Sequence, residues 1–303
     1  MRWFLKLFFL GAASMAVLVC CKTNREANRT GVNVLSGEES EDLKNRIEDI
    51  KKVFFLCPSP AEMLGDIDIN KFDYQSWFLN PKDNADTYLD MKTQTLNLGI
   101  YITDLAYNAL FGRHQETLDY FETVQTLSEK IRVTGAINDE MIRRVKDNAV
   151  NLDSLFAISN EAFMNMVSYC EKNSRSNTIS LLSIGAFIES LYLAINMAAE
   201  FQETDQLINH LAEQKYALDN LVSFAETMPD DKSVSGLLVD MKPIRDIYEQ
   251  LQTEGGQTVV KKDSTNKLVV SGGKKIVLSE KDFLRLKQET GKIRNKITGN
   301  SGT

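Results

Sequence analysis

Metal-ligating and nucleophilic residues are scarce in this chain. Its 303 residues include two histidines, His114 and His210, and four cysteines, with no Cys-x-x-Cys pair. A zinc or iron–sulfur site needs clustered Cys and His ligands, so a site of that kind is nearly excluded. No glycine-rich phosphate loop is present, and no serine or cysteine has a recognisable nucleophile motif. We therefore predict no catalytic residue, no cofactor, no bound metal and no nucleic-acid partner.

Proline and glycine are also rare in the middle of the chain. No proline occurs between Pro81 and Pro229, and only four glycines do. Because these residues interrupt helices, their scarcity predicts a long helical region joined by short connections. The fold class is all-α, an antiparallel helical bundle of about six or seven helices. The predicted helices cover residues 40–55, 85–110, 115–133, 139–170 with a break near Asn151, 178–201, 205–227 and 234–253.

The C-terminal segment has a different pattern. Residues 258–260, 267–270 and 274–278 are short β-prone runs, and 263–266 and 271–273 are turn sequences between them. Ser279 and Asp282 then have capping-box spacing, which predicts a basic helix running to about Ile297. We expect a small β-hairpin or meander followed by this helix.

The N-terminus is the most informative segment. Arg2 and Lys6 precede an apolar run from residue 7 to residue 19, which ends in Cys20 and Cys21. This order is typical of an export signal. The run is shorter than the roughly 20 apolar residues that span a bilayer. The predicted organisation is a signal peptide at 1–20, a flexible tether at 21–37, a helical domain at 38–254 and a basic tail at 255–303.

The sequence Leu18-Val19-Cys20-Cys21 resembles a bacterial lipobox, with Cys20 where Gly, Ala or Ser is usual. The resemblance implies that Cys21 becomes the lipidated first residue, carrying acyl chains such as palmitate. Lipidation at Cys20 and an ordinary cleaved signal with incidental cysteines are the alternatives. Lys22 is not the inner-membrane retention aspartate of some lipoproteins, and residues 23–25 lack an acidic surface-export run. By resemblance to the uncharacterised all-helical lipoproteins of Bacteroidota, we expect an outer-membrane protein facing the periplasm.

Charge divides unevenly along the chain. Residues 257–303 contain eleven Lys and Arg against four Asp and Glu, a net charge of +7, whereas residues 21–256 carry 22 against 38, a net charge of −16. One interpretation is that the basic tail binds an anionic surface, such as lipid headgroups or a cell-wall polymer. The other is that the tail docks on the acidic body or is simply exposed to solvent.

Two helical stretches resemble each other and contain the candidate ligand-binding residues. Gly99 and Gly185 lie inside predicted helices, where glycine is unfavourable unless a neighbouring helix approaches closely. Each is followed by a carboxylate in an apolar stretch, and a buried carboxylate needs a partner or a raised pKa. The two helices form either a ligand or ion site, or a satisfied polar pair that fixes helix register. The candidate residues are Tyr101, Asp104, Tyr107, Glu189 and Tyr192.

The segment Gly99-x-Tyr101-x-x-Asp104 has the spacing of the imelysin-type motif, glycine-x-histidine-x-x-glutamate. Imelysin-like proteins are helical, exported and linked to metal handling, so the resemblance implies a small-ligand or metal-binding function. Tyr101 replaces the histidine and Asp104 the glutamate.

Residues 178–199 are apolar enough to be mistaken for a membrane span. Glu189 near the middle would cost roughly 2.5–3.5 kcal/mol on insertion scales, so we predict a fully buried central helix. Beside the anchor, only Cys57 and Cys170 remain, and the sequence permits either one disulfide or two buried thiols.

The predicted function is a non-enzymatic binding or scaffold lipoprotein of the cell envelope. Its partner would be an envelope protein or polymer that contacts the acidic body or the basic tail. The alternative is a small-ligand or metal-binding lipoprotein that uses the Gly99/Gly185 helix pair.

Overall fold

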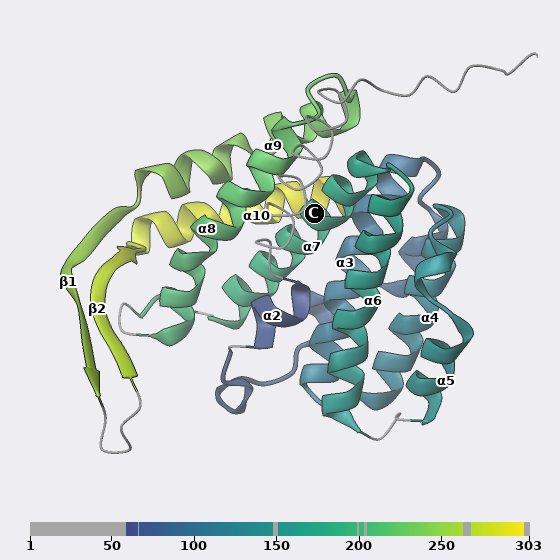
Figure 1. Ribbon diagram of the computed structural model, residues 1–303, viewed down its shortest axis with the longest axis horizontal. Coiled ribbons are helices and arrows are strands. Elements are labelled where there is room, and N and C mark those ends of the chain that lie inside the picture. The colour runs from purple at the N-terminus through teal and green to yellow at the C-terminus, as the bar shows by residue number, and fades with distance from the viewer. Residues whose placement is uncertain are drawn as a thin grey trace, which may run out of the picture. The chain divides into compact units, whose positions relative to one another are not determined.

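The computed structural model describes residues 59–65, 67–147, 151–198, 200–202, 205–262 and 268–299. The predicted signal peptide with Cys21, the tether, the helix at 40–55 and Cys57 lie outside these residues. The described part contains nine helices, four short 3₁₀ segments and one two-stranded antiparallel sheet (Figure 1). The predicted fold class, an all-α bundle with a small hairpin, is confirmed.

Helix positions agree with the sequence pattern to within a few residues at most ends. Asn151 marks the predicted break: its side chain caps α6 by accepting a hydrogen bond from Ser154 N at 3.0 Å. The helices are α2 (Pro60–Gly65), α3 (Met91–Leu110), α4 (His114–Lys130), α5 (Asp139–Asp147), α6 (Leu152–Lys172), α7 (Ser176–Met197), α8 (Gln206–Glu226), α9 (Lys232–Gln250) and α10 (Glu280–Thr298).

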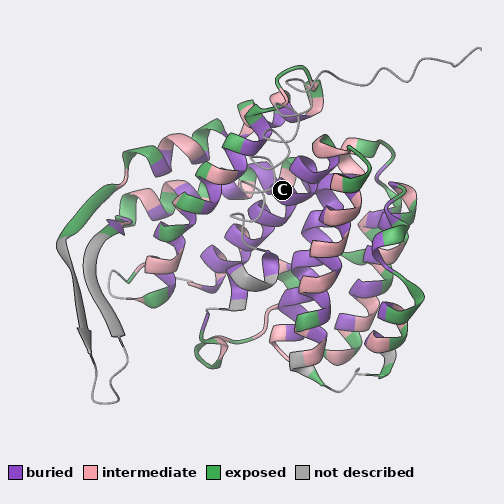
Figure 2. Cartoon of the chain, viewed as in Figure 1, coloured by how far each residue is buried: buried purple, intermediate pink, exposed green. Residues whose placement is uncertain are grey.

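Helix α7 is the core of the bundle. It is long and apolar enough to cross a membrane, but 94% of its most apolar window is buried by other parts of the protein (Figure 2). The prediction of a buried central helix is therefore confirmed. Helices α3, α6, α8 and α10 pack around it, so a helix that is hydrophobic on all sides is covered on all sides.

The contact between α3 and α7 depends on two glycines. A Cβ atom on Gly99 would lie 2.1 Å from Leu182 O, and one on Gly185 would lie 2.0 Å from Leu96 O. Each glycine therefore touches the backbone of the opposite helix, and no larger residue fits at either position. This close backbone contact explains why each of the two helices contains a glycine near its middle, where glycine is otherwise unfavourable.

The sheet is a single long hairpin rather than a meander. Strand β1 (Gln252–Lys262) pairs with β2 (Leu268–Val277), and the register shifts between Gly255 and Thr258. The predicted turn at 271–273 is wrong, because these residues belong to β2, and Ser271 and Gly272 pair with β1. The sequence pattern failed there because Ser and Gly suit both a turn and an irregular strand. In Figure 1 the hairpin extends beyond the ends of α9 and α10.

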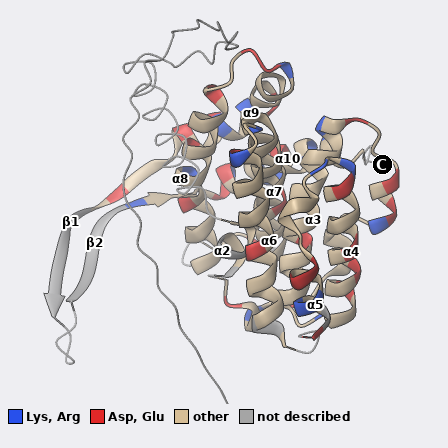
Figure 3. Cartoon of the chain, turned by 45° about the vertical axis from the view of Figure 1, so that its right-hand side comes forward, with Lys and Arg blue, Asp and Glu red and all other residues tan. Residues whose placement is uncertain are grey.

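Helix α10 docks on the helical body. It packs against α7, α9 and α3, and buries an apolar stripe that includes Phe283, Leu286 and Ile293. Lys296 on its outer side pairs with Asp240 of α9 at 2.7 Å. Figure 3 shows basic and acidic residues interspersed over the outer helices. The helical part of the basic tail is therefore a structural element of the bundle.

Candidate functional site

The glycine contact brings the two predicted carboxylates together. Glu189 lies one helical turn after Gly185, on the same face of α7, and Asp104 lies just over one turn after Gly99 on α3. Both side chains are fully buried, and the charge of Glu189 raises the pKa of Asp104. Two neighbouring buried carboxyl groups disfavour two negative charges, so one of them holds a proton.

Arg294 of α10 neutralises the pair. Its Nε donates to Glu189 Oε2 at 2.7 Å and its Nη2 donates to Glu189 Oε1 at 2.8 Å. Nη2 also donates to the backbone oxygen of Phe78 at 2.8 Å. The guanidinium carbon lies 4.2 Å from the centre of the Tyr192 ring, within cation–π distance. The side chain of Arg294 thus joins α10 to α7 and to the segment before α3 that contains Phe78.

The proton belongs on Asp104, because Arg294 binds both oxygens of Glu189 and so favours its charged form. Burial raises the pKa of Asp104 well above its ordinary value, and the charge of Glu189 raises it further, whereas Arg294 opposes the shift. Asp104 Oδ2 accepts a hydrogen bond from Asn80 N at 3.1 Å, and Oδ1 accepts from no N–H or O–H donor of the described chain. Oδ1 is therefore the oxygen free to carry the proton.

The charges of this centre are balanced. Burial alone would lower the pKa of Arg294, but Glu189 raises it, so the guanidinium stays charged. With Asp104 protonated, the centre holds one cation, one anion and one neutral acid. A dry interior tolerates this combination because every charge has a hydrogen-bonded partner.

Asn80 organises the polar surroundings of this centre. Its Nδ2 donates to Tyr88 Oη at 2.9 Å and to Asn97 Oδ1 at 3.2 Å, and its carbonyl accepts from Tyr120 Oη at 3.0 Å. Asn97 in turn donates to Ile297 O of α10 at 2.9 Å. This network fixes the segment before α3 between α3, α4 and the C-terminal helix.

The predicted tyrosines lie near the centre, but their hydroxyls bond elsewhere. Tyr101 Oη donates to Pro81 O at 2.7 Å, and Tyr107 Oη accepts from Gln75 N at 3.1 Å. Burial raises the pKa of Tyr107 to about 12. Tyr192 contributes its ring face to Arg294. Of the five candidate residues, Asp104 and Glu189 are the two whose carboxyl groups influence each other's protonation.

Sequence reasoning missed Arg294, Asn80 and Asn97. Arg294 immediately follows Ile293 of the apolar stripe of α10, so its position near the buried face was readable from the helical period. Nothing in the sequence indicated that its partner lies 105 residues earlier.

The two carboxyl groups of the centre are buried. Neither Asp104 nor Glu189 lines the hollows at His210, Asp119 or Trp77, although Arg294 lines the hollow at Trp77. In the described part of the chain, no group of three or more His, Cys, Asp and Glu side chains is arranged to hold a metal ion. With their proton and charges satisfied internally, the two carboxyl groups can fix helix register.

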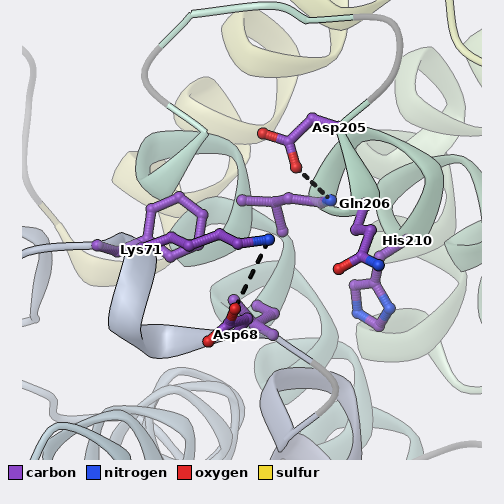
Figure 4. A pocket seen from close by; sticks show the side chains of 8 residues that line it. Asp68, Lys71, Asp205, Gln206 and His210 are labelled. Carbon is purple, nitrogen blue, oxygen red and sulfur yellow. Dashed lines mark hydrogen bonds and ion pairs between the residues drawn. The ribbon is translucent and has the colours of Figure 1, made fainter.

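A small hollow between Asp68, Asp205 and His210 also lacks the room for a ligand. Figure 4 shows these side chains around a space of about 20 Å³, enough for about one water molecule. His210 Nε2 lies 2.7 Å from Met63 O, and Asp205 accepts from Leu207 N at the start of α8. Both side chains therefore serve local structure.

Cys170 is a buried residue of α6, and burial raises the pKa of its thiol to about 11. A thiol with so high a pKa is a poor nucleophile at neutral pH.

No protein-family model, curated protein or solved structure matches this chain.

Proposed function

We propose that this protein is a lipoprotein, anchored through Cys21 in the outer membrane and facing the periplasm, that acts as a non-enzymatic binding or scaffold module of the cell envelope. The lipobox-like sequence supports the anchor. The buried polar centre supports a structural role for the buried charges. The observation that carries the binding role is the β1–β2 hairpin.

The hairpin presents unpaired strand edges. It is a two-stranded sheet, and no third strand of the described chain pairs with either outer edge. Isolated hairpins are marginally stable, and open edges are ready templates for another strand. A partner segment that adds as a third strand would satisfy one row of backbone groups. The hairpin is therefore the part of the described chain best suited to hold another molecule.

The charge of the hairpin indicates the chemistry of this partner. The sequences of the two strands include Lys261, Lys262, Lys274 and Lys275 against the single acid Glu254. A basic pair of strands attracts an anionic partner and repels copies of itself. An acidic segment of an envelope protein or an anionic envelope polymer fits this requirement.

Shortening the hairpin tests the binding role without disturbing α10. Glu254 and Lys275 are cross-strand partners, so the residues between them can be replaced by a two-residue turn. The lipidated wild type and this variant would be cross-linked in cells, purified, and compared by quantitative mass spectrometry and by anionic-polymer assay. We expect an unchanged melting temperature and loss of one co-purifying component.

A matched variant separates charge from strand pairing. Replacing Lys261 and Lys262 by Gln keeps the strand and removes two positive charges, so it should weaken capture of an anionic partner and make capture less dependent on salt. Identical co-purifying components from the wild type and the shortened hairpin would overturn the binding role.

The alternative, a ligand or metal site between the Gly99 and Gly185 helices, has less support. The two glycines bring the backbones into direct contact and leave no space for a ligand between them. Asp104 and Glu189 are occupied by each other and by Arg294.

A further inference from the structure

A second, larger hollow has Arg294 in its lining, whereas neither buried carboxylate lines it. It has a volume of about 510 Å³, within the range of about 300–1,000 Å³ of small-ligand sites. Its wall is formed by Trp77, Pro81, Lys82 and Asp83, and Arg294 lies in its lining. The hollow is separate from the hairpin, so it does not depend on the proposed function.

Trp77 provides an apolar platform at this hollow. Its side chain is 72% exposed, although most large aromatic residues are more favourable when buried. The ring of Phe78 contacts it edge to face, with 6.0 Å between ring centres, and so supports its orientation. An indole face held open at the rim of a polar hollow is suited to stack against a ligand ring.

Arg294 provides hydrogen-bond donors. The residue is 4% exposed, and three of its five N–H groups donate to Glu189 and Phe78. Its Nη1 donates to no described residue and is partly accessible to solvent. Its two N–H groups are therefore available to a ligand in the hollow. The two hydrogen bonds to Glu189 hold the guanidinium plane fixed.

Ion pairs offset the two positive charges at the hollow. Glu189 neutralises Arg294, and Asp119 pairs with Lys82. Asp83 forms no ion pair with a described residue and remains an acceptor. An anionic ligand would meet Asp83 without surplus positive charge, and a simple cation would supply no acceptor for the N–H groups of Arg294. The lining therefore favours a neutral ligand that both donates and accepts hydrogen bonds.

We propose that this hollow binds a neutral saccharide, with a sugar ring stacked on Trp77 and its oxygens accepting hydrogen bonds from Arg294. Sugar rings present apolar C–H faces for stacking and hydroxyls at their edges. A hydroxyl on the same ring donates to Asp83. Where the sugar carries an acetamido group, its carbonyl oxygen is a stronger acceptor for Arg294 than a hydroxyl oxygen is.

The test uses the fluorescence of Trp77. The sequence contains two tryptophans, and Trp3 lies in the predicted signal peptide, so Trp77 is the single tryptophan of residues 21–303. The protein from residue 21, with Cys21 replaced by Ser, would be titrated with cellotetraose and with the tetramer of N-acetylglucosamine. We expect a saturable blue shift of emission and protection from acrylamide quenching with at least one of these sugars.

Variants locate the site, with binding measured by calorimetry and ligand-observed NMR. Trp77→Ala should weaken binding by about tenfold or more, and Asp83→Asn should weaken it less. Tyr216→Ala, at another exposed aromatic side chain on α8, and the shortened hairpin should bind as the wild type does. The proposal is overturned if neither sugar binds at millimolar concentration, if Trp77→Ala binds as Tyr216→Ala does, or if glucuronic acid oligomers bind more tightly.

Discussion

Arg294 of α10 and Glu189 of α7 form a buried bidentate salt bridge, with Nε–Oε2 and Nη2–Oε1 distances of 2.7 and 2.8 Å. The pair joins the last helix of the described chain to its most buried helix. Because one arginine also holds the backbone before α3 through Phe78, the C-terminal helix is needed to complete the core. Removing this helix together with the hairpin would therefore test folding rather than partner binding.

Replacing Glu189 by Gln should destabilise the protein strongly. The variant removes the bidentate counter-ion of Arg294, and loss of one partner of a buried pair typically costs about 3–5 kcal/mol. Urea denaturation followed by circular dichroism measures the change in the free energy of unfolding. Lys242→Gln, which breaks the exposed pair with Asp246, is the control and should have little effect. Equal effects of the two changes would show that the buried pair does not hold α10 in place.

Replacing Asp104 by Asn should alter how stability depends on pH. The pKa of Asp104 is raised in the folded protein above its ordinary value of 3.8, so the folded state binds the proton more tightly than the unfolded state. The wild type is therefore stabilised most below this value and loses stability as the pH rises toward the folded pKa.

The asparagine side chain of this variant would keep an acceptor for Asn80 N and would supply an N–H group toward Glu189 without needing a proton. The stability of Asp104→Asn relative to the wild type should therefore increase with pH above about 4, by up to about 1.4 kcal/mol per pH unit. Urea titrations at a series of pH values measure the difference. A difference that stays constant from acid to neutral pH contradicts a protonated Asp104.

Replacing Gly99 by Ala should force α3 and α7 apart. The added methyl group would meet Leu182 O at 2.1 Å, a backbone atom that cannot move alone. We expect a loss of about 3 kcal/mol or more, at the upper end of overpacking effects. Gly236→Ala on the exposed side of α9 is the matched control, because nothing lies within 4 Å of its added methyl group. That change should stabilise the protein by about 1 kcal/mol through helix propensity. Thermal melts that show both variants unchanged or stabilised would contradict the close contact.

The helices were predictable because their signals are local. The scarcity of proline and glycine, the capping residue Asn151 and the apolar period located most helix ends to within a few residues. The hairpin was less predictable, because Ser271 and Gly272 resemble a turn and only pairing with β1 makes them a strand. Strand pairing is a long-range property, and a single sequence carries little information about it.

The candidate site shows the same division. The glycines and carboxylates of α3 and α7 could be identified because mid-helix glycine and buried acid are each unfavourable without a neighbour. The sequence did not allow us to identify Arg294, Asn80 or the hollow at Trp77. Their roles depend on which distant segments the fold brings together. The need of the buried Glu189 for a partner was predictable, but the identity of that partner was not.

The proposed envelope location depends most directly on Cys21. The decisive measurement is fractionation of cells that express the wild type or Cys21→Ser, with protease added to intact cells and to cells with a permeabilised outer membrane. The wild type should sediment with the outer membrane and be digested only after permeabilisation, whereas Cys21→Ser should be soluble. Membrane attachment of Cys21→Ser at the wild-type level, or digestion of the wild type on intact cells, would contradict a periplasm-facing lipoprotein.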